Sequence, residues 1–71
     1  MGYPDYLERG IRTLRLIERS RFGITVSQLT EKTETSKRTM YRILEKLALI
    51  EPIYTERRGK EAFYKFLRDE Q

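Results

Sequence analysis

The chain has 71 residues and a net charge of +4, from fifteen Lys and Arg against eleven Asp and Glu, and it contains neither His nor Cys. A chain of this length supports one domain with one small core, which excludes a two-domain enzyme. Without His or Cys it cannot form a disulfide, a zinc finger, a thiolate nucleophile or a histidine general base. We therefore expect no enzyme activity, no metal and no cofactor.

Hydrophobic and charged residues are almost equally frequent, at 38% and 37% of the chain. This balance is typical of a soluble globular domain and not of a membrane-spanning one. The longest apolar run, residues 47–50, is too short for a signal peptide. The expected location is therefore the cytoplasm, in association with the nucleoid. The positive charge suits an anionic partner.

The first predicted helix covers about residues 5–20, because apolar residues recur there at steps of three and four and form one stripe. The stripe consists of Leu7, Ile11, Leu14 and Ile17, and the arginines at positions 9, 12, 15 and 19 follow another face, which either is solvated or contacts phosphate. Gly10 lies inside the pattern and indicates either a close approach of another helix or a weak first turn. For a possible homodimer, the surface around Tyr3, Tyr6 and Gly10 is the first candidate interface.

Two shorter helices are predicted over about residues 26–33 and 37–48. Thr25 or Ser27 can cap the N-terminus of the first, and Ser36 is a suitable cap for the second. Only a very short turn separates the two helices. This is the spacing of a helix-turn-helix.

A β-hairpin is predicted from about residue 50 to residue 67, because β-branched and aromatic residues flank a turn that contains Gly59. Pro52 has no N–H to donate, so we expect it at the start of a strand or on an edge. Tyr64 and Phe66 are expected to face the core and Phe63 to be partly exposed. The expected fold class is mainly α with a small β-hairpin, an α+β fold, in a single domain over residues 1–71.

The third helix has two chemically different faces when its residues are placed at 100° intervals. One face carries Met40, Ile43, Leu44 and Leu47, and the opposite face carries Arg38, Tyr41, Arg42 and Glu45. Arginine can bond bidentately to guanine, while tyrosine and threonine hydroxyls and the N–H groups of a helix N-terminus suit phosphate oxygens. With Lys37 and Thr39 in its first turn, the polar face predicts contact with DNA. The alternative is a solvated surface with internal charge pairs.

Glu45 has two interpretations on this face. It can accept a hydrogen bond from cytosine N4, or it can orient Arg42 or Arg38. We favour the second role.

The tip of the hairpin carries three cations, Arg57, Arg58 and Lys60, next to Gly59. Basic residues on a flexible tip can cross a phosphate backbone or enter a minor groove, and the alternative is a polar turn that prevents edge aggregation. Four cations against Glu45 give the third helix a charge of +3, and the tip cations against Glu56 and Glu61 leave +1. These two segments account for the whole net charge of the chain.

Most of the chain resembles the N-terminal winged helix-turn-helix of bacterial and archaeal regulators of the IclR, DeoR and WYL-domain types. The resemblance rests on residues 6–14, 24–29, 36–47 and 52–60, with Tyr64 closing the last stretch. It implies three helices and a two- or three-stranded wing, with the third helix in the major groove and the wing over the backbone. Matched to the motif, Ser36 is the helix cap, Thr39 and Tyr41 are phosphate contacts, and Arg38 and Arg42 are base readers.

The sequence departs from that family at the turn and at the end of the third helix. Glu34 and Thr35 stand where glycine and an apolar residue are common, which suggests a differently shaped turn with weaker packing, and Ala48 stands where a glycine often ends the helix. The regulators named usually carry a larger sensing or dimerising domain after this module. The chain is expected to be either an excised DNA-binding domain or a small self-sufficient regulator such as a repressor.

Two functions from different classes follow. The first is sequence-specific binding of double-stranded DNA by a transcriptional regulator, as a dimer on a symmetric operator. The second is a protein-interaction module, in which the third helix or the aromatic residues Tyr3 and Phe63 dock a partner. The dependence of binding on salt separates the two, because phosphate contacts weaken steeply with ionic strength.

Overall fold

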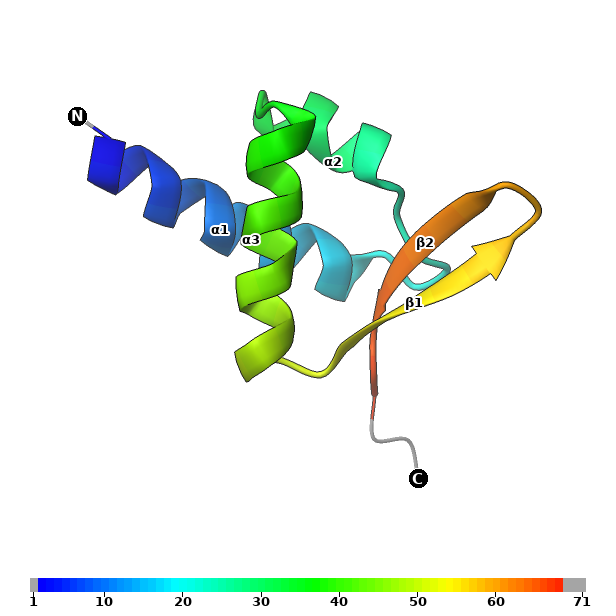
Figure 1. Ribbon diagram of the computed structural model, residues 1–71. Helices are drawn as coiled ribbons and strands as arrows, with labels where there is room; N and C mark the ends of the chain where they lie inside the picture. The colour runs from blue at the N-terminus through cyan, green and yellow to red at the C-terminus, as the bar shows by residue number, and fades with distance from the viewer. Residues whose placement is uncertain (1, 69–71) are drawn as a thin grey trace.

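The computed structural model describes residues 2–68, with side chains from residue 6 onward. It contains three helices, α1 (Gly2–Arg19), α2 (Val26–Thr33) and α3 (Lys37–Ile50), followed by strands β1 (Ile53–Arg58) and β2 (Glu61–Phe66). In Figure 1, α3 stands in front of α1 and the hairpin projects away from the helices. This is the predicted small α+β fold of three helices with a hairpin wing. Within residues 2–68, the helices are too short or too polar to cross a lipid bilayer.

Helices α1 and α3 extend further than predicted, and a proline lies near the changed end of each. Helix α1 begins at Gly2, before the expected start near residue 5. Pro4 is compatible with this start, because N–H groups in the first turn have no partner within the helix. Helix α3 continues to Ile50 instead of residue 48 and ends where Glu51 takes an extended conformation. The residue before a proline is driven to that conformation, and Pro52 follows.

Side-chain caps fix the start of α2 and of α3. Thr25, not Ser27, caps α2: its Oγ1 accepts from the Gln28 N–H at 3.2 Å, and its own N–H donates to the Gln28 side chain at 3.0 Å. This reciprocal pair is a capping box. Ser36 caps α3 as predicted, with its Oγ accepting from the Thr39 N–H at 3.2 Å.

In the turn between α2 and α3, one residue adopts a backbone conformation that is usual for glycine although it is not a glycine. Glu34 adopts a left-handed conformation, with φ 54° and ψ 49°, and its N–H donates to the Thr30 carbonyl. Thr35 behind it is 7% exposed. Its hydroxyl donates to the Thr33 carbonyl at 3.1 Å, while the Thr33 hydroxyl donates to the Leu29 carbonyl at 2.7 Å. The turn therefore buries a threonine whose hydroxyl is hydrogen-bonded.

The core lies between the three helices and one face of the hairpin. Its buried apolar residues are Ile17, Ile24, Val26, Leu29, Met40, Ile43 and Leu44, with Tyr64 and Phe66 packed against them. This confirms the predicted inner face of α3 and the predicted inward direction of Tyr64 and Phe66. Thr13 is also fully buried, and its hydroxyl donates to the Arg9 carbonyl at 2.7 Å.

Helix α1 places only part of its apolar stripe in the core. Ile17 is fully buried, but Leu7 is 66% exposed and Ile11 is 47% exposed. Here α1 and α3 do not close on one another, and a groove lined by Leu7 and Ile11 on α1 and by Leu47 on α3 lies between them. A Cβ on Gly10 would meet nothing within 4 Å. The expectation of a close helix approach at Gly10 is therefore wrong.

The hairpin is held to the helices through the segment before α2. Its strands pair in register from Ile53 with Phe66 to Arg58 with Glu61. Ile24 exchanges two backbone hydrogen bonds with Tyr64, at 2.8 and 3.0 Å, and thus forms an isolated β-bridge beside the two-stranded sheet. Gly23 has φ +98°, and a Cβ there would lie 2.8 Å from the Phe63 Cβ. Phe63 is thus half-buried against a glycine that cannot be replaced without a shift.

Candidate nucleic-acid interface

The outward face of α3, consisting of Arg38, Tyr41, Arg42 and Glu45, is open to solvent along its whole length. All four residues are exposed, and the Tyr41 side chain is 52% exposed. The buried residues Met40, Ile43 and Leu44 hold the opposite side of the helix in the core. The helix thus presents two guanidinium groups and a phenol on one rigid element. In the described part of the chain, no ion pair joins Glu45 to either arginine.

The N-termini of α2 and α3 carry neutral caps and no acidic residue in the first turn. Carboxylates are commonly favoured at this end of a helix, where the N–H groups and the helix dipole give a partial positive charge. Without them, that partial charge is available to an outside anion. Thr39 is half-buried and its hydroxyl accepts from Ser36 at 3.1 Å, which leaves its proton free to be donated.

A polar groove of about 250 Å³ opens between the start of α2, the start of α3 and the hairpin. We call it the hairpin groove. Its cations are Lys37 from α3 and Arg57 and Lys60 from the hairpin, and Ser27 and Tyr41 line it as well. Segments about twenty residues apart in the sequence therefore bring three positive charges to one place, with the Glu61 carboxylate beside them. The outward face and the hairpin groove share Tyr41, so they form one continuous surface.

The two arginines of the hairpin point to opposite faces of the sheet. Arg57 lies in the hairpin groove. Arg58 donates to the Phe22 carbonyl, lies 4.2 Å from the centre of the Phe63 ring and pairs with Glu56 at 3.6 Å. Alternation along a strand explains the difference between these neighbours. The structure therefore places Arg57 and Lys60 beside Lys37, and it places Arg58 away from them.

Two ionisable groups of the hairpin have shifted pKa values. A hydrogen bond from Lys65, at 3.1 Å, lowers the pKa of Glu56 below its ordinary value of 4.5, with help from the charges of Lys65 and Arg58. Burial raises the pKa of Tyr64 above its ordinary value of 10.0, and the nearby Tyr41 adds to the effect. The Tyr64 phenol thus lies neutral behind the hairpin groove at physiological pH.

The cation Lys46 does not lie on this surface, although it belongs to the positive charge predicted for the third helix. It lines a separate groove on the other side of α3, next to α1. Ser27 and the capped start of α2, by contrast, are part of the surface and were not predicted as site residues. Their only sequence signal was the choice of possible caps before α2. Across residues 2–68, no group of three acidic side chains is placed to hold a metal ion.

No protein-family model matches this chain, and searches of curated proteins and of solved structures gave no significant match.

Proposed function

We propose that the protein is a sequence-specific, double-stranded DNA-binding module of a transcriptional regulator. The observation that carries the proposal is the continuity of the outward face of α3 with the cationic hairpin groove. An α-helix with exposed side chains fits the major groove of B-DNA, where base edges differ in their donors and acceptors. A cationic groove beside that helix suits the phosphate backbone that borders the major groove.

Each part of the surface has a separate role in this proposal. Arg38 and Arg42 donate to base edges from the outward face of α3. Lys37, Arg57 and Lys60 neutralise phosphates along the hairpin groove. The hydroxyls of Thr39 and Tyr41 and the N–H groups at the helix N-termini add neutral donors to phosphate oxygens, and Ser36 holds the Thr39 hydroxyl in place. Arg58 fixes the hairpin to the loop before α2 and does not contact DNA.

The direct test is selection of preferred duplexes from a random library, followed by titration of the winning duplex at several salt concentrations. Three phosphate-neutralising cations per protomer predict a slope of log affinity against log salt of about −3 per protomer. Selection of no sequence at all would contradict the proposal.

Replacement of Arg42 by alanine tests the base-reading role. We expect binding to the selected duplex to weaken by about 1–3 kcal/mol, while binding to a scrambled duplex changes much less, because a bidentate contact to a base is lost. The readout is the ratio of the two affinities, measured by fluorescence anisotropy. Equal losses on both duplexes would assign Arg42 to the backbone.

The neighbouring arginines of the hairpin provide a matched pair for the phosphate role. Arg57→Ala should weaken binding to all duplexes and reduce the salt slope by about one unit. Arg58→Ala removes the same charge one residue away, from the opposite face, and should leave the salt slope unchanged. An equal change of slope in both variants would mean that the two faces of the hairpin are not distinguished by DNA.

A protein-interaction module is the second candidate, and the exposed apolar groove between α1 and α3 favours it. In that case binding to the partner would depend little on salt, because an apolar contact releases no counterions. The same titrations separate the two functions.

A further inference from the structure

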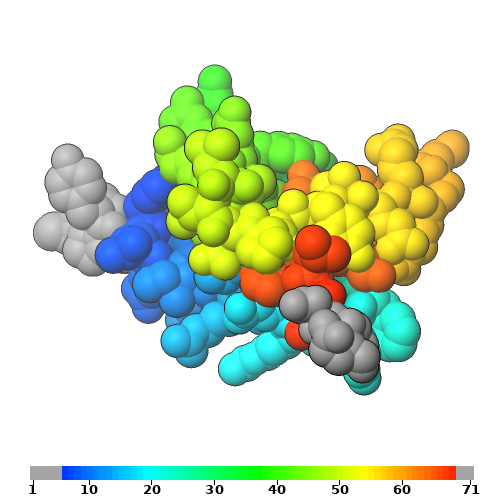
Figure 2. All heavy atoms as spheres, turned by 90° about the horizontal axis from the view of Figure 1, so that it is seen from below, coloured from blue at the N-terminus to red at the C-terminus, as the bar shows by residue number. Residues whose placement is uncertain are grey.

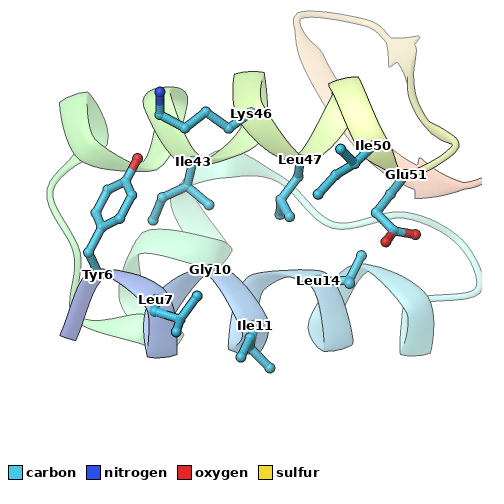
Figure 3. A pocket seen from close by; sticks show the side chains of 10 residues that line it. All are labelled: Tyr6, Leu7, Gly10, Ile11, Leu14, Ile43, Lys46, Leu47, Ile50 and Glu51. Carbon is cyan, nitrogen blue, oxygen red and sulfur yellow. The ribbon is translucent and has the colours of Figure 1, made fainter. Parts of the chain in front are cut away.

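A groove of about 280 Å³ runs between α1 and α3 and is lined almost entirely by apolar side chains. Figure 2 shows the C-terminal part of α3 lying next to α1 on this side of the molecule. We call it the α1–α3 groove. Its walls are Tyr6, Leu7, Ile11 and Leu14 on α1 and Ile43, Leu47 and Ile50 on α3, as Figure 3 shows. Gly10 leaves its floor open, since no atom lies within 4 Å of a Cβ built there.

The exposed walls of this groove are large. Leu7 is 66% exposed, Ile11 is 47% exposed and Ile50 is 74% exposed. Single exposed apolar residues are ordinary, but a contiguous set on two neighbouring helices marks a binding surface. Leu7 and Ile11, one turn apart, also form a ridge beside the groove, so the same surface offers both a ridge and a groove. A surface of that kind can pack against itself, because ridges of one helix fit grooves of another.

The charged residues at the two ends of the α1–α3 groove favour a second copy of this protein over other binding partners. Lys46 reaches toward the Tyr6 end and Glu51 lies at the Leu14 end, as Figure 3 shows. Their positions on the chain are separated by about 7.5 Å along the helix axis, at 1.5 Å per residue. A twofold axis through the groove exchanges its two ends. It therefore sets Lys46 of one protomer opposite Glu51 of its partner, twice.

The outer edge of α1 repeats this arrangement. Glu8 and Arg15 are both exposed and lie seven residues apart, so they point to the same side of the helix. Glu8 pairs with Arg12 of its own helix at 4.0 Å, and two copies of α1 that cross antiparallel at Ile11 bring this exposed carboxylate of each protomer toward Arg15 of the other. Both pairs of opposite charges are thus matched by the same symmetry. A partner with a single sign of charge would satisfy only one end of each element.

We propose that the α1–α3 groove is a homodimer interface, in which each protomer inserts its Leu7–Ile11 ridge into the groove of the other about a twofold axis. The four helices α1 and α3 of the pair then enclose one shared apolar layer. The interface stands independently of DNA binding, since the outward face of α3 and the hairpin groove lie outside it. Tyr3, also suggested for this surface by the sequence, lies outside the residues whose side chains are described.

Sedimentation of the full chain without DNA tests the proposal. Wild-type protein should shift from monomer to dimer as its concentration rises to millimolar. Leu7→Asp should raise the dimer dissociation constant at least tenfold, because a carboxylate is then buried in an apolar layer. Leu7 is mostly exposed in the protomer, so the variant should fold, which circular dichroism checks. Phe22→Asp, at a residue 75% exposed in the loop before α2, is the control and should dimerise like wild type.

A charge exchange identifies the occupant. Lys46→Glu alone and Glu51→Lys alone each place like charges opposite one another, and each should weaken self-association about threefold to tenfold. An equal mixture of the two variants restores both pairs in a heterodimer and should associate with wild-type strength. A wild-type protein that stays monomeric at every concentration, or a mixture no stronger than its components, would overturn the proposal. Binding of a single protomer to DNA is titrated separately on a duplex that holds one half-site, so a failure of the dimer and a failure of the proposed function are distinguished.

Discussion

Among the described residues, Gly23, Glu34 and Gly59 adopt a positive φ angle, which is unusual for residues other than glycine. Glu34 occupies a left-handed conformation at the end of α2, where glycine is the usual residue. Gly23, also at positive φ, lies so close to Phe63 that a side chain has no room. Gly59 also has positive φ, at the first of two residues between the strands, but a Cβ there would meet nothing within 4 Å. A positive φ angle and a lack of room for a Cβ atom are thus two separate reasons for a glycine. Gly23 has both, whereas Gly59 has only the first.

Replacement of Glu34 by glycine should stabilise the protein by about 0.5–1 kcal/mol. A left-handed conformation costs a non-glycine residue on the order of 1 kcal/mol, and part of that gain is offset by the greater freedom of glycine in the unfolded chain. Glu31→Gly, inside α2, should instead destabilise by about 1 kcal/mol, because the backbone there is helical. Urea unfolding of both variants measures the difference in sign. If both substitutions destabilised the protein, the Glu34 side chain would contribute more to the free energy of unfolding than its left-handed backbone conformation costs.

The elements show where the sequence is informative and where it is not. The faces of α3 follow from periodicity alone, because one face is apolar and the other is charged, so Met40 and Arg42 were assigned to the correct sides. The same periodicity groups Leu7 with Ile17 on one stripe of α1. It contains no information on how far the neighbouring helices extend, and therefore it does not reveal that Leu7 lies outside the core.

The hairpin illustrates the same limit for the candidate site. The three cations at its tip were grouped by their proximity in the sequence. Alternation separates Arg57 from Arg58, but which of the two faces α3 depends on how the sheet sits on the helices. That position is set by the bridge between Ile24 and Tyr64 and by Gly23, which are tertiary contacts.

The capping of α2 by Thr25 was one of two alternatives that local sequence left open.

The hairpin is also the element with a predicted pH dependence. Because the pKa of Glu56 is lowered in the folded protein, its ion pair with Lys65 stabilises the fold above the ordinary carboxyl pKa. This contribution disappears as the pH falls through the lowered value. Glu56→Gln should melt at a lower temperature than wild type at neutral pH and at the same temperature in strong acid. Lys65→Gln breaks the same contact and should also lower the neutral melting temperature. A temperature difference for Glu56→Gln that persists in acid would show that the carboxylate charge is not responsible.

At the scale of the whole molecule, three surfaces meet at α3. Its inner residues fill the core, its outward face is proposed for DNA and its remaining side lines the α1–α3 groove. A dimer built on that groove carries two outward faces related by the same twofold axis. The proposed target is therefore a site with matching symmetry, and linking two half-sites raises avidity without new contacts.

Because α3 contributes to three surfaces, few of its residues can be substituted without affecting one of them. Of its fourteen residues, only Ala48 and Leu49 have no assigned surface, and Thr39 both belongs to the N-terminal cap and is proposed to contact phosphate. In a library of random substitutions selected for DNA binding, this helix should tolerate the fewest changes in the chain. New sequence preferences would then arise through Arg38, Tyr41, Arg42 and Glu45, the positions that neither the core nor the dimer constrains. The rest of α3 is expected to stay fixed while the specificity of the protein changes.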